Sequence, residues 1–321
     1  MEAGMTDSGT ENSAAAGGPT LNRKRSYYAV LFLDLLGQRE AISSLEDLKL
    51  LRDDEAEYYR RFGEAAGKVW GVRTFFSKRM AGGMAAALPS AAYHVPDVTF
   101  QMFLDTVMVY FPWDPQNPNA LIALRSLLVA TAETMICTLS GGVPIRGGLD
   151  VHLATEFNEQ AQVENSSSAL FHGGDLWGPA PKRAYELAET DHNYMRVRLG
   201  DGVSGLIITA LLWFKEQVGI DPSKVIWFQP AVDAANETTK LIARDPVDNL
   251  PIIDYLGPAT ADLMPANIRL VGKAVAFAQR EYERFKVDTN SRSIADKYER
   301  FLKYVDARQV PNGIVPPLAE T

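Results

Sequence analysis

The chain has very little cysteine and little histidine. Its single cysteine, Cys137, lies in the apolar stretch "ETMICTL" and has no second cysteine with which to form an internal disulfide. A lone thiol in such surroundings is typical of a protein from a reduced compartment. The four histidines lie without close ligand spacing, which argues against a structural zinc site.

Long hydrophobic runs and an excess of positive charge are also missing. No run reaches the roughly 18 uncharged apolar residues of a membrane span, and the N-terminus lacks the basic-then-apolar order of a signal peptide. We therefore expect a cytoplasmic protein without membrane contact. The formal net charge of -8 argues against a broad electrostatic grip on nucleic acid, although a local site for a small anionic substrate remains compatible with it.

What is present is the composition of an ordinary globular protein, with 46% hydrophobic and 22% charged residues. Residues 1–24 are rich in Gly, Ser, Ala and Thr, which predicts a disordered tail. We expect one catalytic domain over residues 25–260, interrupted by an irregular insertion at about 68–96, and a helical C-terminal extension over 261–321.

Apolar runs and periodicity predict elements in the order β, α, β, β, α, β. The run "SYYAVLFLDLLG" indicates a buried strand, and "VTFQMFLDTVMVYFP" is typical of a hairpin broken near Asp105. This order predicts an α+β, ferredoxin-like fold, with an antiparallel-rich sheet covered by helices. Further strands are predicted in "VPIRGGLDVHLATEF" and "NYMRVRLG", and helices over 45–66, 117–140, the second half of "DLWGPAPKRAYELAE", 201–219 and 266–308.

Two aspartates stand in unusually apolar surroundings. Asp34 is flanked by leucines in "AVLFLDLLGQ", and Asp105 lies in "QMFLDTVMV". A buried carboxylate needs a cation or hydrogen-bond donors, and two at neighbouring strand ends would suit Mg²⁺ or Mn²⁺ on a triphosphate. Gly37 permits a tight, phosphate-cradling turn. The competing interpretation of either aspartate alone is a turn former or a helix N-cap.

A third segment gives this pair a context. The motifs "DLLG" (residues 34–37), "LDTVMVYF" and "DLWG" (residues 175–178) follow one another as they do in class III nucleotide cyclases, which the chain resembles over roughly residues 26–200. The resemblance implies a class III cyclase fold. It also implies two Mn²⁺ or Mg²⁺ ions held by Asp34, Asp105 and the main-chain carbonyl of Leu35, and a homodimer with active sites at the subunit interface.

The chain departs from that family after "DLWG". Lys182 stands at the position of the family's ribose-orienting asparagine, and Glu186 at that of its transition-state arginine. Lys182 and Arg146 are candidates for the missing positive charge, since cationic side chains suit phosphate oxygens. Lys182 and Glu186 are equally well explained as an ordinary helix i, i+4 pair.

The strand "IRGG", followed by "WGPAPKRAYELAE", resembles the pyrimidine nucleotide cyclases of Pycsar anti-phage systems. This resemblance implies conversion of UTP, or alternatively CTP, to a 3′,5′-cyclic nucleotide that a separate effector reads. The wider class III resemblance implies base-binding roles for Gln101 and Asp175, and Gly37 and Trp177 are further candidate substrate-binding residues. Gln101 and Asp175 could each meet uracil or cytosine, so they leave the base open. A different metal-dependent nucleotidyltransferase and a catalytically inactive binding module remain as alternatives.

Overall fold

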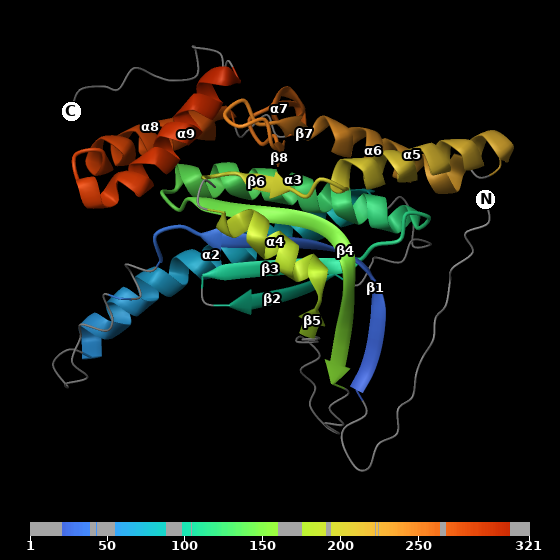
Figure 1. Cartoon of the computed structure of the whole chain (residues 1–321), viewed down its shortest axis with the longest axis horizontal. Coiled ribbons are helices and arrows are strands. Elements are labelled where there is room, and N and C mark those ends of the chain that lie inside the picture. The colour runs from blue at the N-terminus through green and yellow to red at the C-terminus, as the bar shows by residue number, and fades with distance from the viewer. Residues whose placement is uncertain are drawn as a thin grey trace.

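The structure is a computed structural model of the chain (Figure 1). It describes residues 21–38, 43, 55–87, 98–103, 105–159, 175–190, 194–221, 223, 225–263 and 268–308. Several predictions therefore fall outside the described residues: the first 20 residues of the predicted tail, residues 45–54 of the first predicted helix and residues 88–96 of the predicted insertion.

The first six elements form the ferredoxin-like unit that the sequence predicts. They are β1 (Leu21–Leu35), α2 (Glu55–Ala87), β2 (Thr99–Phe103), β3 (Thr106–Pro112), α3 (Pro118–Ser140) and β4 (Ile145–Glu159). The strands lie in the order β2-β3-β1-β4, and all three neighbouring pairs are antiparallel. The predicted α+β class and the order of elements along the chain are thus confirmed.

The second half of the chain widens the sheet and adds helices. β6 pairs parallel to β4, and the sheet continues through β8 to β7, while β5 pairs with β4 off this path. The helical segments predicted after residue 200 correspond to α5, α8 and α9. The elements are β5 (Asp175–Trp177), α4 (Pro179–Glu189), β6 (Val197–Leu199), α5 (Val203–Ile220), α6 (Val225–Lys240), β7 (Ile242–Arg244), β8 (Pro251–Ile253), α7 (Pro258–Leu263), α8 (Ile268–Phe285), a 3₁₀ turn (Thr289–Ser291) and α9 (Arg292–Ala307).

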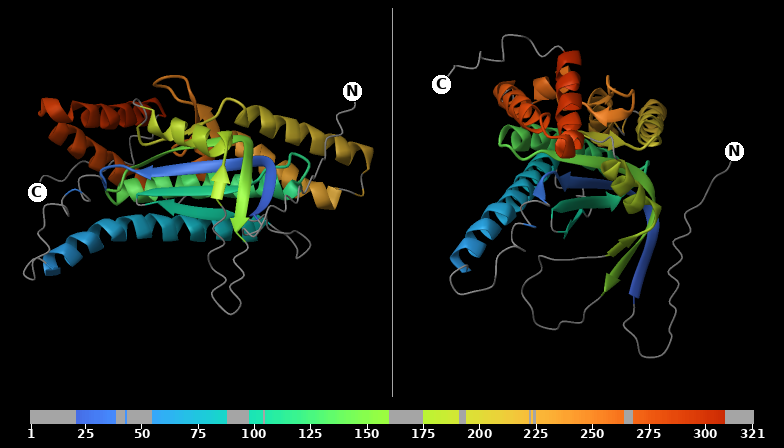
Figure 2. Two further views of the ribbon diagram at one scale, coloured as in Figure 1. Left: turned by 60° about the horizontal axis from the view of Figure 1, so that its bottom comes forward. Right: turned by 60° about the vertical axis from the view of Figure 1, so that its left-hand side comes forward.

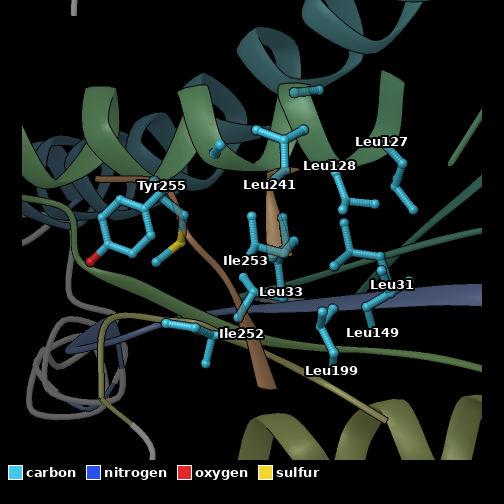
Figure 3. Packing of buried hydrophobic residues seen from close by; sticks show 14 of the residues in the cluster. Leu31, Leu33, Leu127, Leu128, Leu149, Leu199, Leu241, Ile252, Ile253 and Tyr255 are labelled. Atoms are coloured by element: carbon cyan, nitrogen blue, oxygen red, sulfur yellow. The ribbon is translucent and has the colours of Figure 1, made fainter. Parts of the chain in front are cut away.

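Alternating side chains of β1 supply two cores, one on each face of the sheet. Leu31 and Leu33 point to the face covered by α3, where they join Leu127 and Leu128 in the main cluster (Figure 3). Residues 28, 30 and 32 point to the other face, where a smaller cluster includes two alanines of α4. This period of two places Asp34 on the α4 face, because it follows residue 32 by two positions.

The predicted irregular insertion is wrong for residues 68–87, which are the continuation of α2. Glycine-rich sequence lowers intrinsic helix propensity, but tertiary packing overrides it here. Val72, Phe76, Met80 and Met84 recur every four residues and are buried. At Gly83 an added Cβ would lie 3.4 Å from Ser126 of α3, so the glycine also lets the two helices approach closely.

The predicted tail is too long, because residues 21–24 already belong to β1 and pair with residues 156–159 of β4. The ladder with β4 satisfies backbone groups that composition alone would leave to water. Figures 1 and 2 show that β1 and β4 bend together, away from the rest of the sheet, at the start of β1 and the end of β4. β5 lies along this bent part of β4.

The C-terminal helices pack against the rest of the fold, since α8 contacts α3 and contributes to the main core. The predicted domain boundary near residue 260 falls within α7 and stays a prediction.

Among the described helices, α3 and α5 are long and apolar enough to cross a membrane by length and composition. The apolar window of α3 is 78% buried in the fold and that of α5 is 22% buried; core helices pass the same test, so this composition is weak evidence for a span.

Candidate active site

The two aspartates that stand in apolar sequence surroundings, Asp34 and Asp105, lie side by side. Asp34 is the penultimate residue of β1 and pairs with Thr106, the first residue of β3. Asp105 occupies the turn just before β3, and its carbonyl oxygen accepts a hydrogen bond of 3.0 Å from the backbone N–H of Leu35. The predicted juxtaposition of Asp34 and Asp105 at neighbouring strand ends is therefore present in the fold.

Asp34 is almost fully buried, at 8% exposure of the residue. Burial raises the pKa of its carboxyl, a hydrogen bond and the charge of Arg146 lower it, and the charges of Asp105 and Glu189 raise it further. The contribution of Asp105 shows that the two carboxylates lie within electrostatic reach of each other. A cation between them would relieve that repulsion.

Arg146, the predicted phosphate-binding cation, lies beside Asp34 in the ladder between β1 and β4. Its Nε donates a hydrogen bond of 2.8 Å to Asp34 Oδ2, and its Nη2 donates one of 2.8 Å to Glu189 Oε1 at the end of α4. Arg146 is thus shared between two carboxylates. The sequence identified Arg146 as a site residue but did not indicate either partner.

Gly37 adopts the conformation that its predicted role requires. Its φ is +82°, which L-residues with a Cβ rarely adopt, and open space surrounds the position of an added Cβ. The neighbouring Leu36 N–H donates to the carbonyl of Pro144, which fixes the turn against the start of β4. Gly37, Leu35 and Asp34 therefore lie together at the end of β1.

Lys182 and Glu186 lie one helical turn apart on α4, where the Lys182 ammonium is 3.5 Å from Glu186 Oε1. Both side chains are largely exposed, at 72% and 57%. The ordinary i, i+4 pair is the interpretation that the structure bears out. In this arrangement the ammonium of Lys182 is partnered by a carboxylate at the surface.

The predicted base-binding residues lie in two different parts of the sheet. Gln101 of β2 is half-buried opposite Met108, which pairs with residue 32 of β1, so Gln101 lies on the α4 face near the Asp34 end of the sheet. Asp175 opens β5 and is exposed, and Trp177, two residues later, is 66% exposed. They flank Leu176, whose side chain joins the cluster on the α4 face, so Asp175 and Trp177 point to the opposite face, at the bent end of the sheet. The charge of Asp175 contributes to raising the pKa of Tyr110.

Sequence reasoning missed a polar cluster on the α4 face of the sheet. Glu156 accepts hydrogen bonds from the hydroxyls of Tyr28, at 3.1 Å, and Tyr110, at 3.5 Å. Burial, then the charge of Glu156, raises the pKa of Tyr110 to about 12. The alternation of β1 could have predicted that Tyr28 lies on the same face as Asp34. The position of Glu156 depends on the bend of β4, which no local sequence pattern indicates.

The Asp34 and Asp105 carboxylates and the nearby main-chain carbonyls are hard oxygen donors of the kind that Mg²⁺ and Mn²⁺ prefer. Within the described ranges, no group of three or more His, Cys, Asp or Glu side chains could hold a metal ion.

No protein-family model matches this chain, and no curated protein matches its sequence. Similar solved structures include two of a bacterial light-regulated adenylyl cyclase, at 16% and 18% identity and a TM-score of 0.34, each covering 58% of this chain and 46% of that one. Another is a class III adenylyl cyclase-like ATP-binding protein from Pseudomonas aeruginosa, at 12% identity and a TM-score of 0.35, covering 57% of this chain and 35% of that one.

These matches span less than half of each solved chain. A similarity at this level supports no inference about the chemistry of the site.

Proposed function

We propose that this chain is a nucleotide cyclase that converts UTP to 3′,5′-cyclic UMP and pyrophosphate. The observation that carries the proposal is the placement of Asp34 and Asp105 side by side, locked by the 3.0 Å hydrogen bond between Leu35 and Asp105. Supporting it are the ferredoxin-like strand order and the segment "DLWG", which forms β5 and leads into α4.

Two divalent cations, Mn²⁺ or Mg²⁺, are proposed to bind Asp34, Asp105 and the carbonyl of Leu35. Bound there, they would neutralise the triphosphate and favour in-line attack of the ribose 3′-hydroxyl on the α-phosphorus. The protein's own contribution is to hold the carboxylates at the ends of paired strands, where backbone hydrogen bonds fix their separation. Holding reactants in line is worth several kcal/mol, so positioning accounts for much of the proposed catalysis.

The remaining site residues are proposed to orient the substrate. Gly37 allows the backbone to approach phosphate, and Arg146 and Lys182 are the candidate cations for the triphosphate. Gln101, Asp175 and Trp177 are proposed to bind the base. An ionised Asp175 only accepts hydrogen bonds, which suits N3–H of uracil or the amino group of cytosine. UTP is preferred from the resemblance to Pycsar cyclases, and CTP is the alternative.

We further propose that the enzyme is a cytoplasmic homodimer, with each active site between two subunits. The exposed Trp177 in β5 supports this, because aromatic residues are enriched at protein–protein interfaces relative to the rest of the surface. The cyclic product would act in anti-phage defence through a separate effector protein that reads it.

A catalytically inactive binding module is the second candidate, and two ion pairs favour it. Asp34 already has a cationic partner in Arg146, and Lys182 is paired with Glu186. In such a module these pairs would be structural. The two candidates differ in whether the chain turns over a nucleoside triphosphate.

The test is incubation with ATP, GTP, CTP and UTP separately in Mn²⁺, with mass analysis of the products. We expect cyclic UMP and pyrophosphate from UTP, and a loss of at least about 10²-fold in rate for Asp105→Asn, the scale of removing several kcal/mol of charge stabilisation. Asp233→Asn is the control, since it makes the same chemical change on the exposed surface of α6.

An Asp105→Asn variant that keeps its activity would overturn the metal-ligand assignment. Absence of pyrophosphate release with every triphosphate would favour the binding module. Circular dichroism and size-exclusion chromatography of the variant establish that its fold and assembly are unchanged.

A further inference from the structure

Arg146 joins the candidate cation site to the far end of α4. Its guanidinium bridges Asp34 Oδ2 through Nε and Glu189 Oε1 through Nη2, both at 2.8 Å. Arg146 and Asp34 are almost fully buried, and the side chain of Glu189 is 29% exposed. Nη1 takes part in neither of these two hydrogen bonds, so the guanidinium meets the two carboxylates through different nitrogens.

The position of Glu189 is unfavourable for α4 itself. It is the last residue of the helix, and the last turn contains no basic residue. The C-terminal end of a helix carries a partial negative charge, so a carboxylate there is repelled rather than stabilised. The ion pair with Arg146 offsets this repulsion. It is therefore the contact with Arg146, rather than the helix, that favours a carboxylate at this position.

A cation that binds Asp34 must compete with Arg146 for the same carboxylate. If Asp34 were the only carboxylate within reach, the guanidinium would have to be left buried without a partner when the cation binds, which is costly. Glu189 removes that cost, because it holds the guanidinium through a separate nitrogen while Asp34 exchanges partners. Its charge also reaches Asp34, as the pKa of the Asp34 carboxyl responds to it.

We propose that Glu189 is a positioning residue for the candidate cation site. It keeps the Arg146 guanidinium paired when Asp34 releases the guanidinium and binds a divalent cation. This inference rests on the proposed function, since it takes Asp34 as a cation ligand. It adds that the cation affinity of this chain is set by a residue at the end of α4, on a different element from either candidate ligand.

The test is Mn²⁺ binding by the full-length protein without nucleotide, measured by calorimetry or by the electron paramagnetic resonance signal of free Mn²⁺. In Glu189→Gln the guanidinium keeps Asp34 as its carboxylate partner, so we expect Mn²⁺ affinity to fall by roughly 5-fold or more, the scale of one screened charge interaction. Glu189→Asp keeps the charge on a shorter side chain and should fall between wild type and Glu189→Gln.

Glu186→Gln is the matched control, because it removes the same charge from the same helix, three residues earlier, where Lys182 is the partner. Mn²⁺ affinity should stay near the wild-type value in this variant. An equal fall in both variants would show a general charge effect and overturn the role of Glu189. If Glu189→Gln does not fold, the Glu189→Asp variant decides, and wild-type affinity there would likewise overturn it.

Mn²⁺ binding distinguishes a failure of the role of Glu189 from a failure of the proposed function. Wild-type protein that binds Mn²⁺ in an Asp105-dependent manner, together with unchanged binding in Glu189→Gln, overturns only the role of Glu189. Wild-type protein without Asp105-dependent Mn²⁺ binding overturns both that role and the proposed metal-dependent function.

Discussion

At the scale of single residues, the described fold buries carboxylates outside the candidate active site as well as within it. Asp254 follows β8 and is 5% exposed. Its Oδ1 accepts a hydrogen bond of 2.7 Å from Tyr304 of α9 and lies 3.0 Å from Arg308 Nε. Burial raises the pKa of the Asp254 carboxyl above its ordinary value of 3.8, and the contacts with Tyr304 and Arg308 only partly oppose this.

The pH dependence of stability follows from that direction. Because the folded-state pKa is raised, the native protein holds the proton more tightly, and this stabilising contribution is present below pH 3.8 and lost as the pH rises through the folded-state pKa. Asp254→Asn keeps an acceptor for Tyr304 but cannot ionise. We therefore expect its free energy of unfolding, relative to wild type, to increase as the pH rises from 3.8 through the folded-state pKa, as measured by urea denaturation. A decrease over this range would mean that the ion pair with Arg308 outweighs burial.

Single residues also show how far sequence reasoning could reach. Asp34 and Asp105 were identifiable because a carboxylate among leucines needs a specific partner. The partner of Asp34 was not identifiable, since it depends on the register that places Arg146 opposite Asp34 across 112 positions of sequence. Local pattern carries no information on such a register, so Arg146 was assigned to phosphate rather than to Asp34.

At the scale of elements, the close packing of α4 on β4 determines where Glu189 and Lys182 lie. An added Cβ at Gly148 of β4 would collide with the carbonyl oxygen of Ala184 and lie 2.5 Å from the Cβ of Leu187 and 2.9 Å from the nitrogen of Ala188. Two of these three contacts are with backbone, which cannot move aside as a flexible side chain would. Gly148 is therefore required for α4 to lie against the sheet.

Gly148→Ala should destabilise the protein by about 1–3 kcal/mol or more, the cost of overpacking a close contact. Gly67→Ala is the matched control, because Gly67 is exposed within α2 and open space surrounds the added Cβ. Alanine has the higher helix propensity, so this variant should gain about 0.5–1 kcal/mol. Urea denaturation measures both, and equal effects in the two variants would contradict the described packing of α4.

The elements differ in how well the sequence predicted them. The hairpin of β2 and β3 and the helix α3 were predictable, because alternation and a long apolar run are local signals. The end of α2 was not, since Gly82 and Gly83 lower helix propensity and only packing against α3 retains the helix. Strands β7 and β8 have three residues each, too few for a periodic pattern to emerge.

At the scale of the whole molecule, the sheet joins regions that the sequence separates. Asp34 and Asp105 lie at one end of β1, whereas Asp175 and Trp177 lie in β5, along the part of β4 that pairs with the beginning of β1. β1 and β4 have 15 residues each, so the two ends of β1 are separated by the length of a long strand. A single substrate could meet both groups if they came from different subunits, as the proposed homodimer requires.

This arrangement predicts complementation between two inactive variants. In a heterodimer of Asp105→Asn and Asp175→Ala, one site carries both changes and the other carries neither. After subunit exchange at equal amounts, half of the dimers are mixed and each has one intact site, so we expect about a quarter of the wild-type rate of cyclic UMP formation.

The control mixes Asp105→Asn with Asp34→Asn. Both changes then affect the same half of the site, every site in the heterodimer carries one of them, and the rate should not recover. Recovery in the first mixture alone requires that the cation-binding half and the "DLWG" half of one site come from different chains. If neither mixture recovers although exchange is verified by mass spectrometry of differently tagged subunits, each site lies within a single chain, and the dimeric active site is wrong.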